Sequence, residues 1–353
     1  MDDLVDQAGV TVSAVTVISN VKRSASMLPP EKIPNNLSHI EYTRLQIRYT
    51  SLGWLRQAMA AAAHAIKNQP QSENLSVEAK KRTTALFDAL EKVLLLGEFS
   101  EGIEKNVKGL TEHTLNQADK ALDKIQHVKQ VKDGIKSVFT MVSQTVQETI
   151  DGGLENHLLP AFGMPLDRIP EGKTTEEYYR LALRYDQIGA CEPARECLQK
   201  VLDVELKKDT QLANQAQRFL KTRIPARKVN HDAMIQYMSA LRFIVTKKED
   251  IAKDLLVELE VKHPNFEAPL VTLASMELKD GNLDRGKYLL NAAQQVNPNY
   301  IKTWCAKGRL AIAEWFLLDL DYCVDKASSL NGFDSGTTAL AGMKQFIDQN
   351  GLR

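Results

Sequence analysis

Histidines and cysteines are the residues of this chain best suited to catalysis or metal binding, and their spacing favours neither. The seven histidines are scattered along the 353 residues without a zinc-ligand spacing. The four cysteines form no CxxC pair and have no histidine at zinc spacing. Glycine-rich phosphate loops, GxSxG and HExxH are all absent. We therefore predict no catalytic residue, no metal site and no cofactor, and expect that the protein is not an enzyme.

The composition argues against nucleic acid as a partner and against an integral membrane segment. Lys+Arg and Asp+Glu number 45 each, so the formal net charge is zero. Binding to nucleic acid independently of sequence needs a basic surface, and we therefore expect no nucleic-acid partner. The segment Val10–Val21 is apolar but shorter than the ~20 residues that cross a bilayer, so no integral membrane segment is expected. Unpaired cysteines and a start of Met-Asp-Asp predict a cytoplasmic protein.

Proline, glycine and apolar spacing divide the chain into five parts. Residues 1–36 are predicted to be a flexible tail, and residues 37–151 a helical N-terminal region. Clustered prolines and glycines indicate a linker at 152–173. A helical array is predicted for 174–335, followed by a capping helix at 336–353.

Small and large apolar residues recur every 34 residues in the C-terminal half. The clearest unit, Glu267–Pro298, carries Leu270, Leu273, Ala274, Gly281, Gly286, Leu290 and Ala293. Another, Thr175–Leu206, carries Tyr178, Leu181, Ala182, Tyr185, Gly189, Ala194, Leu198 and Val201. This pattern resembles the tetratricopeptide repeat family over about residues 175–350. The resemblance implies an all-α fold, an α-solenoid of helix-turn-helix repeats joined to a helical N-terminal region.

The repeat pattern is irregular in two places. An additional helix is predicted at Asp209–Thr222, so that the next unit begins near Ala233, or at His231 if its first helix starts earlier. From Asp334 the sequence leaves the 34-residue register, but its apolar spacing still predicts an amphipathic helix that caps the array.

The family resemblance implies an inner groove lined by the first helix of each repeat. Helical phase places acidic charge near one end of this groove and basic charge near the other. Family members that clamp chaperone carboxylates use a Lys/Asn/Arg set, and the missing asparagine argues against that role here. The predicted lining consists of Tyr179, Leu183, Asp186, Tyr237, Leu241, Val271, Ser275, Lys302 and Arg309, with Glu176, Leu278 and Cys305 beside them.

We therefore predict a non-catalytic adaptor or assembly factor that binds a protein or peptide partner in this groove. One alternative is that the N-terminal helices of the same chain fill the groove. Another is a self-associating structural scaffold, a homo-oligomer formed through the apolar stripe of Thr111–Ile150. An enzyme would need chemistry near His157 and Asp167, which flank the linker loop.

Overall fold

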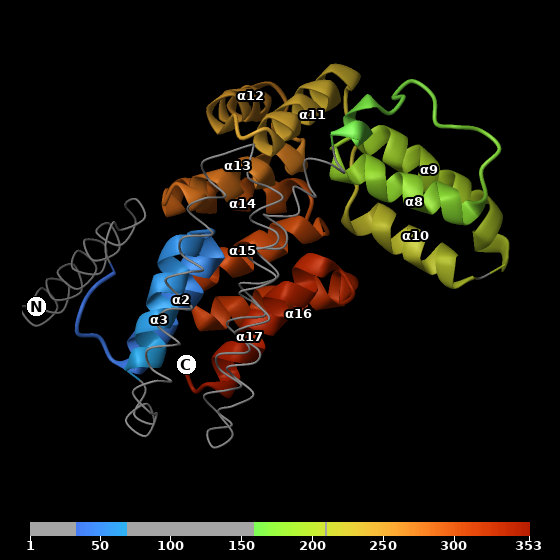
Figure 1. The fold of residues 1–353 in the computed structure, drawn as a ribbon. Coiled ribbons are helices and arrows are strands. Elements are labelled where there is room, and N and C mark those ends of the chain that lie inside the picture. Colours follow the sequence, from blue (N-terminus) through green and yellow to red (C-terminus); the bar gives the residue numbers. More distant parts are fainter. Residues whose placement is uncertain (1–32, 69–158, 209) are drawn as a thin grey trace, which may run out of the picture.

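The computed structural model describes residues 33–68, 159–208 and 210–353, and this part of the chain is all-helical, which confirms the predicted all-α class (Figure 1). Its α-helices are α2 (His39–Leu52), α3 (Leu55–Lys67), α8 (Thr175–Gln187), α9 (Cys191–Glu205), α10 (Gln211–Thr222), α11 (His231–Val245), α12 (Glu249–Lys262), α13 (Glu267–Lys279), α14 (Leu283–Val296), α15 (Ile301–Glu314), α16 (Leu317–Asn331) and α17 (Ser335–Gln349). Two 3-10 helices, η2 (Pro160–Gly163) and η3 (Leu206–Lys208), are short.

Most helices pack with a neighbour in sequence. The pairs are α2 with α3, α8 with α9, α11 with α12, α13 with α14, and α15 with α16. From α12 onward, every second helix starts 34 residues after the last one. Helices α12, α14 and α16 begin at Glu249, Leu283 and Leu317, and helices α13, α15 and α17 begin at Glu267, Ile301 and Ser335. The prediction that the chain leaves this register at Asp334 is therefore wrong, since α17 begins in phase with α13 and α15.

Glycines allow neighbouring helices to approach closely. A Cβ atom on Gly286 would lie 2.6 Å from Leu278 Cδ2, and one on Gly308 would lie 2.4 Å from Leu340 Cδ2. Distances this short are unavailable to a larger residue unless the leucine moves. The first contact joins α14 to α13, and the second joins α15 to α17.

The additional helix predicted after the first pair is α10, which packs against α9 and also contacts α16. Main-chain N–H groups of the following loop donate to two carboxylates: Ala226 N to Glu267 Oε1 at 2.8 Å, and Val229 N to Glu192 Oε1 at 2.9 Å. The loop is therefore fixed to both α13 and α9. The next helix, α11, begins at His231, the earlier of the two predicted starts.

The N-terminal helices form a hairpin. The described part of the predicted helical region is divided into two helices at Gly53, whose φ is +79°. This left-handed conformation suits glycine at a helix C-terminus. Within the hairpin, the Tyr42 and His64 rings stack with their centroids 4.9 Å apart.

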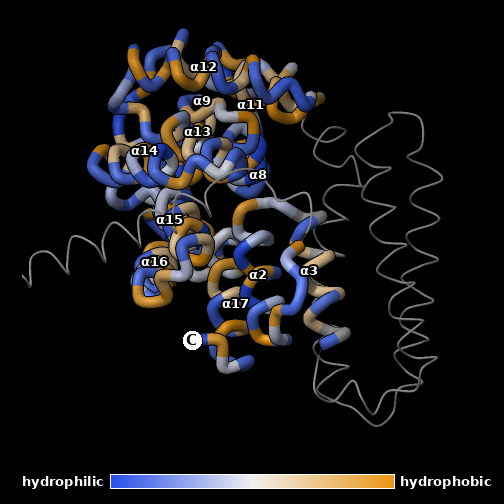
Figure 2. The backbone as a smooth tube through the Cα atoms, turned by 90° about the vertical axis from the view of Figure 1, so that its left-hand side faces the viewer, coloured by the Kyte–Doolittle hydropathy of each residue, from blue (hydrophilic) through white to orange (hydrophobic). Residues whose placement is uncertain are grey.

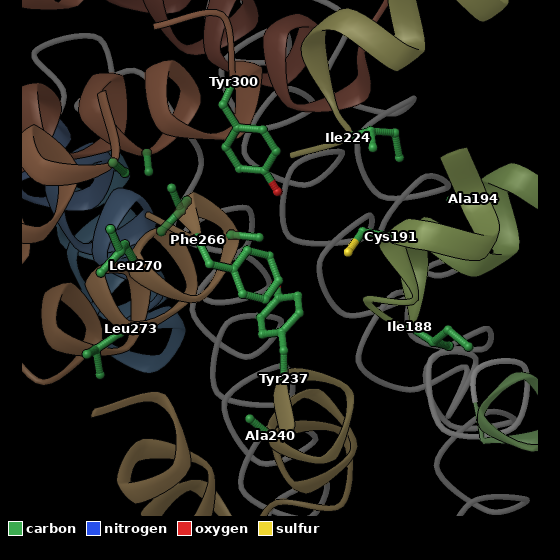
Figure 3. Close-up of a cluster of buried hydrophobic side chains, with 14 of the residues drawn as sticks. Ile188, Cys191, Ala194, Ile224, Tyr237, Ala240, Phe266, Leu270, Leu273 and Tyr300 are labelled. Carbon is green, nitrogen blue, oxygen red and sulfur yellow. The ribbon is translucent and has the colours of Figure 1, made fainter. Parts of the chain in front are cut away.

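The core runs through the C-terminal pairs. Buried residues of α13 and α15 lie around most of each helix circumference, which indicates that other segments cover both sides of these helices. The outer helix α12 instead alternates hydrophobic and hydrophilic residues along its length (Figure 2). Tyr300, Phe266 and Tyr237 follow one another through the middle of the core (Figure 3).

Candidate interaction surface

The nine residues predicted to line the groove lie on α8, α11, α13 and α15, and we call the surface that they define the inner face. None of the nine is exposed, so other parts of the chain cover each of them at least partly. Asp186, Tyr237 and Val271 are buried, and Tyr179, Leu183, Leu241, Ser275, Lys302 and Arg309 are half-buried.

The charged residues of the inner face contact one another. Lys302 Nζ lies 3.2 Å from Asp186 Oδ1, and Arg223 Nη2, from the residue after α10, lies 3.2 Å from Asp186 Oδ2. The prediction that acidic and basic charge lie at opposite ends of the groove is therefore wrong. The chain brings α8 and α15 together, and the buried carboxylate has two cationic partners.

A fourth residue completes this group, which we call the ion cluster: Asp186, Arg223, Lys302 and Asp334. Arg223 Nη1 lies 2.9 Å from Asp334 Oδ2. The other oxygen, Asp334 Oδ1, accepts from Gly336 N at 3.0 Å and begins α17 as its N-cap. One arginine thus connects the end of α10 with both α8 and the start of α17.

Tyr237 belongs to the junction between the first helix pair and the second. A Cβ atom on Gly189 would lie 2.8 Å from Tyr237 Cδ1 and 2.9 Å from Leu241 Cδ1, so both side chains pack against the turn between α8 and α9. The Tyr237 hydroxyl lies 3.0 Å from Thr272 Oγ1, and its ring meets Phe266 edge-on at 5.3 Å. Burial raises the pKa of Tyr237 above its ordinary value.

Arg309 is a covered cation on the same face. Its Nη2 donates to Ser275 Oγ at 2.9 Å, and Ser275 Oγ donates to the Val271 carbonyl at 3.0 Å. Burial lowers the pKa of Arg309, because removal from water disfavours the charged form. Three of the predicted groove residues thus form one chain of hydrogen bonds between α15 and α13.

The N-terminal hairpin packs against the C-terminal helices, since α2 contacts α15. The Trp54 indole N–H donates to the Lys279 carbonyl at 2.6 Å, and Arg48 Nε donates to the Ala313 carbonyl at 2.9 Å. These carbonyls belong to the last turns of α13 and α15. The alternative in which N-terminal helices of the same chain fill the groove stays a prediction, and Thr111–Ile150 and His157 lie outside the described residues.

Helix α8 is the first helix of the array and lies on the side of the molecule opposite α2 and α3 in Figure 1. Tyr179 is half-buried with its ring edge-on to Phe219 of α10, at 6.2 Å between centroids. Leu183 is half-buried one turn further along the helix. Arg180 and Arg184 adjoin these two residues in sequence and are exposed.

The four cysteines are free thiols and three of them are buried. Burial raises the pKa of Cys191, Cys197 and Cys323 to about 12, and that of Cys305 to about 11. Because the thiolate is the nucleophilic form, these groups are poor nucleophiles near neutral pH.

Within the described residues, no group of three or more His, Cys, Asp or Glu side chains could hold a metal ion. A search of the same residues finds no helix with the length and apolar character that spanning a membrane requires.

Sequence reasoning missed Arg223, Asp334, Arg48 and Trp54. The only local signal among them is Asp334 followed by Ser-Gly-Thr, which is typical of a helix N-cap. Comparison with family models, curated proteins and solved structures finds no match for this chain. The functional proposal therefore depends on the geometry and the residue pattern alone.

Proposed function

We propose that residues 174–335 are an array of tetratricopeptide-type units and that the protein is a non-catalytic adaptor or assembly factor. The observation that carries this proposal is the 34-residue interval between helix starts, held by α12, α14 and α16 and again by α13, α15 and α17. Such arrays present a preformed surface for a segment of another protein, and their first helices make the contact. The raised pKa values of the four thiols fit a role without cysteine chemistry.

We place the partner on α8, because the inner-face residues of α13 and α15 already contact other residues of the chain. Tyr179 and Leu183 offer apolar surface one turn apart, and Arg180 and Arg184 adjoin them as exposed cations. This arrangement suits an amphipathic segment with apolar residues on one side and acidic residues at its edge. The apolar contact supplies affinity and the arginines set direction.

The proposal can be tested by capturing partners from native lysate with the full chain. A captured protein would then be mapped on the chain by hydrogen–deuterium exchange, and slower exchange is expected in α8. The matched variants are Arg180→Glu with Arg184→Glu, which should weaken capture, and Lys262→Glu with Lys326→Glu, exposed on α12 and α16, which should leave it unchanged. Protection confined to other helices, or capture insensitive to the α8 variant, would contradict this placement.

A further inference from the structure

The side-chain hydrogen bonds from the N-terminal hairpin to the C-terminal helices share one chemistry. Each is a side-chain donor of the hairpin on a main-chain carbonyl near a helix end: Trp54 on Lys279, Arg48 on Ala313, and Arg44 Nε on Leu352 at 3.3 Å. Carbonyls of a last helical turn have no partner within their own helix, and they carry the negative end of the helix dipole. At α13 and α15 the hairpin therefore supplies donors that these helix ends lack, and Arg44 adds a hydrogen bond to the residues after α17.

The apolar side chains of the hairpin are divided between two hydrophobic clusters. Ile47, between the two arginines in sequence, is buried in the cluster that includes Trp304, Leu340 and Ile347. Leu52 and Trp54 join the main core cluster. The hairpin thus combines a few apolar anchors with cationic and indole donors, the combination that recurs at protein–protein interfaces.

The chain connects this hairpin to the array through a long segment. Residues 69–158, which lie outside the described residues, separate α3 from the turn before η2. Docking of α2 on α15 is therefore a contact between two parts of one chain that lie far apart in its sequence.

We propose that the face of α13, α15 and α17 covered by α2 is a docking site for a helix, and that the hairpin α2–α3 is its resident, displaceable occupant. This proposal goes beyond the proposed function, because it assigns a second site, distinct from the α8 surface, to a different kind of partner. A competing partner carries two arginines four residues apart, an apolar residue between them and a following indole, as Arg44, Ile47, Arg48 and Trp54 do. The acceptors are main-chain carbonyls, which every residue has. Recognition therefore depends on the side-chain donors of the competing partner helix.

The test uses the full chain and a fluorescently labelled synthetic peptide of residues 33–68. The released variant is Ile47→Asp with Arg48→Ala, which places a charge in an apolar cluster and removes one donor. Peptide binding is measured by fluorescence anisotropy, and hydrogen–deuterium exchange follows the hairpin and the last turns of α13 and α15. We expect the released variant to bind the peptide at least roughly tenfold more tightly than the native chain, because the tethered competitor is weakened. A peptide carrying the same two substitutions should bind neither protein.

Three results would overturn the proposal. In the first, the released variant shows faster exchange in every helix, so the hairpin is an inseparable part of the fold. In the second, only the hairpin exchanges faster, yet the native peptide still does not bind. In the third, the hairpin keeps its native protection, so the named contacts do not hold it. Lysate capture that remains sensitive to Arg180→Glu and Arg184→Glu would, in each of these cases, preserve the proposed adaptor function.

Discussion

The Lys302 ammonium and the Asp186 carboxylate lie 3.2 Å apart although 116 positions separate them in sequence. This contact ties the last turn of α8 to the first turn of α15. The helix pairs are consequently held across the array as well as between neighbours, and Arg223 strengthens the tie by binding both Asp186 and Asp334.

Replacing Asp186 with asparagine should destabilise the chain by about 2 kcal/mol. The carboxylate is buried, and its loss leaves Arg223 and Lys302 without their shared anion. Urea unfolding followed by circular dichroism measures the change. Glu249→Gln is the matched control, because its pair with Lys279 is exposed and should contribute no more than ~0.5 kcal/mol. Equal effects of the two substitutions would show that the ion cluster does not stabilise the fold.

Substitution of Gly189 should cost more stability than substitution of Gly53. Both glycines have a φ of +79°, so alanine at either position carries a similar backbone cost of about 1 kcal/mol. Only at Gly189 would the new Cβ also meet Tyr237, at 2.8 Å, whereas nothing lies within 4 Å at Gly53. Comparing the two unfolding free energies isolates the steric contribution, and a smaller loss at Gly189 would mean that the α8–α11 junction is loose.

Alanine at Gly308 and at Gly342 should have opposite effects. The Gly308 Cβ would lie 2.4 Å from Leu340, so we expect a loss of about 1–3 kcal/mol from overpacking. Gly342 is exposed on α17 with nothing within 4 Å, and alanine there should stabilise the helix by up to ~1 kcal/mol. Thermal unfolding of the two variants checks the signs. A neutral Gly308→Ala would show that Leu340 moves aside without cost.

The protein should lose stability as the pH rises above about 9. Burial raises the pKa of Cys191, Cys197 and Cys323 to about 12 in the folded chain, whereas unfolded thiols ionise near 8.5. The folded state therefore binds more protons between these values. The stabilisation that the protonated thiols give the folded state is complete below the pKa of the unfolded thiols, and it is lost as the pH rises toward 12.

Denaturation at fixed urea across pH 8–11 measures this dependence. Ellman's reagent provides a second measurement: the native thiols should react slowly at pH 8, and all four should react after unfolding. Rapid reaction of the native chain would contradict the burial of these groups. A variant in which alanine replaces Cys191, Cys197 and Cys323 should lose less stability than the native chain as the pH rises.

Periodic features of this protein could be predicted from its sequence, and its long-range contacts could not. The repeated apolar positions correctly indicated the C-terminal helices, and His231 was recognised as one start of α11, because helical packing imposes a local spacing. The break at Gly53 was missed, since the apolar spacing continues across it. Nothing in the spacing of Asp186, Lys302 and Arg223 indicates that they meet, because their pairing depends on how the helix pairs curve in three dimensions.

The hairpin also has a consequence for how the protein is synthesised. The hairpin's donor side chains are synthesised first, and the carbonyls that accept from them are synthesised much later. The Lys279 carbonyl follows Trp54 by 225 residues, and the Leu352 carbonyl follows Arg44 by 308. At about 5–20 residues per second, the ribosome takes roughly 15–60 s to complete the last of them. During that interval the Arg44 contact cannot form. The hairpin is therefore completed later during synthesis than helix pairs whose partners are neighbours in the sequence, such as α13 and α14.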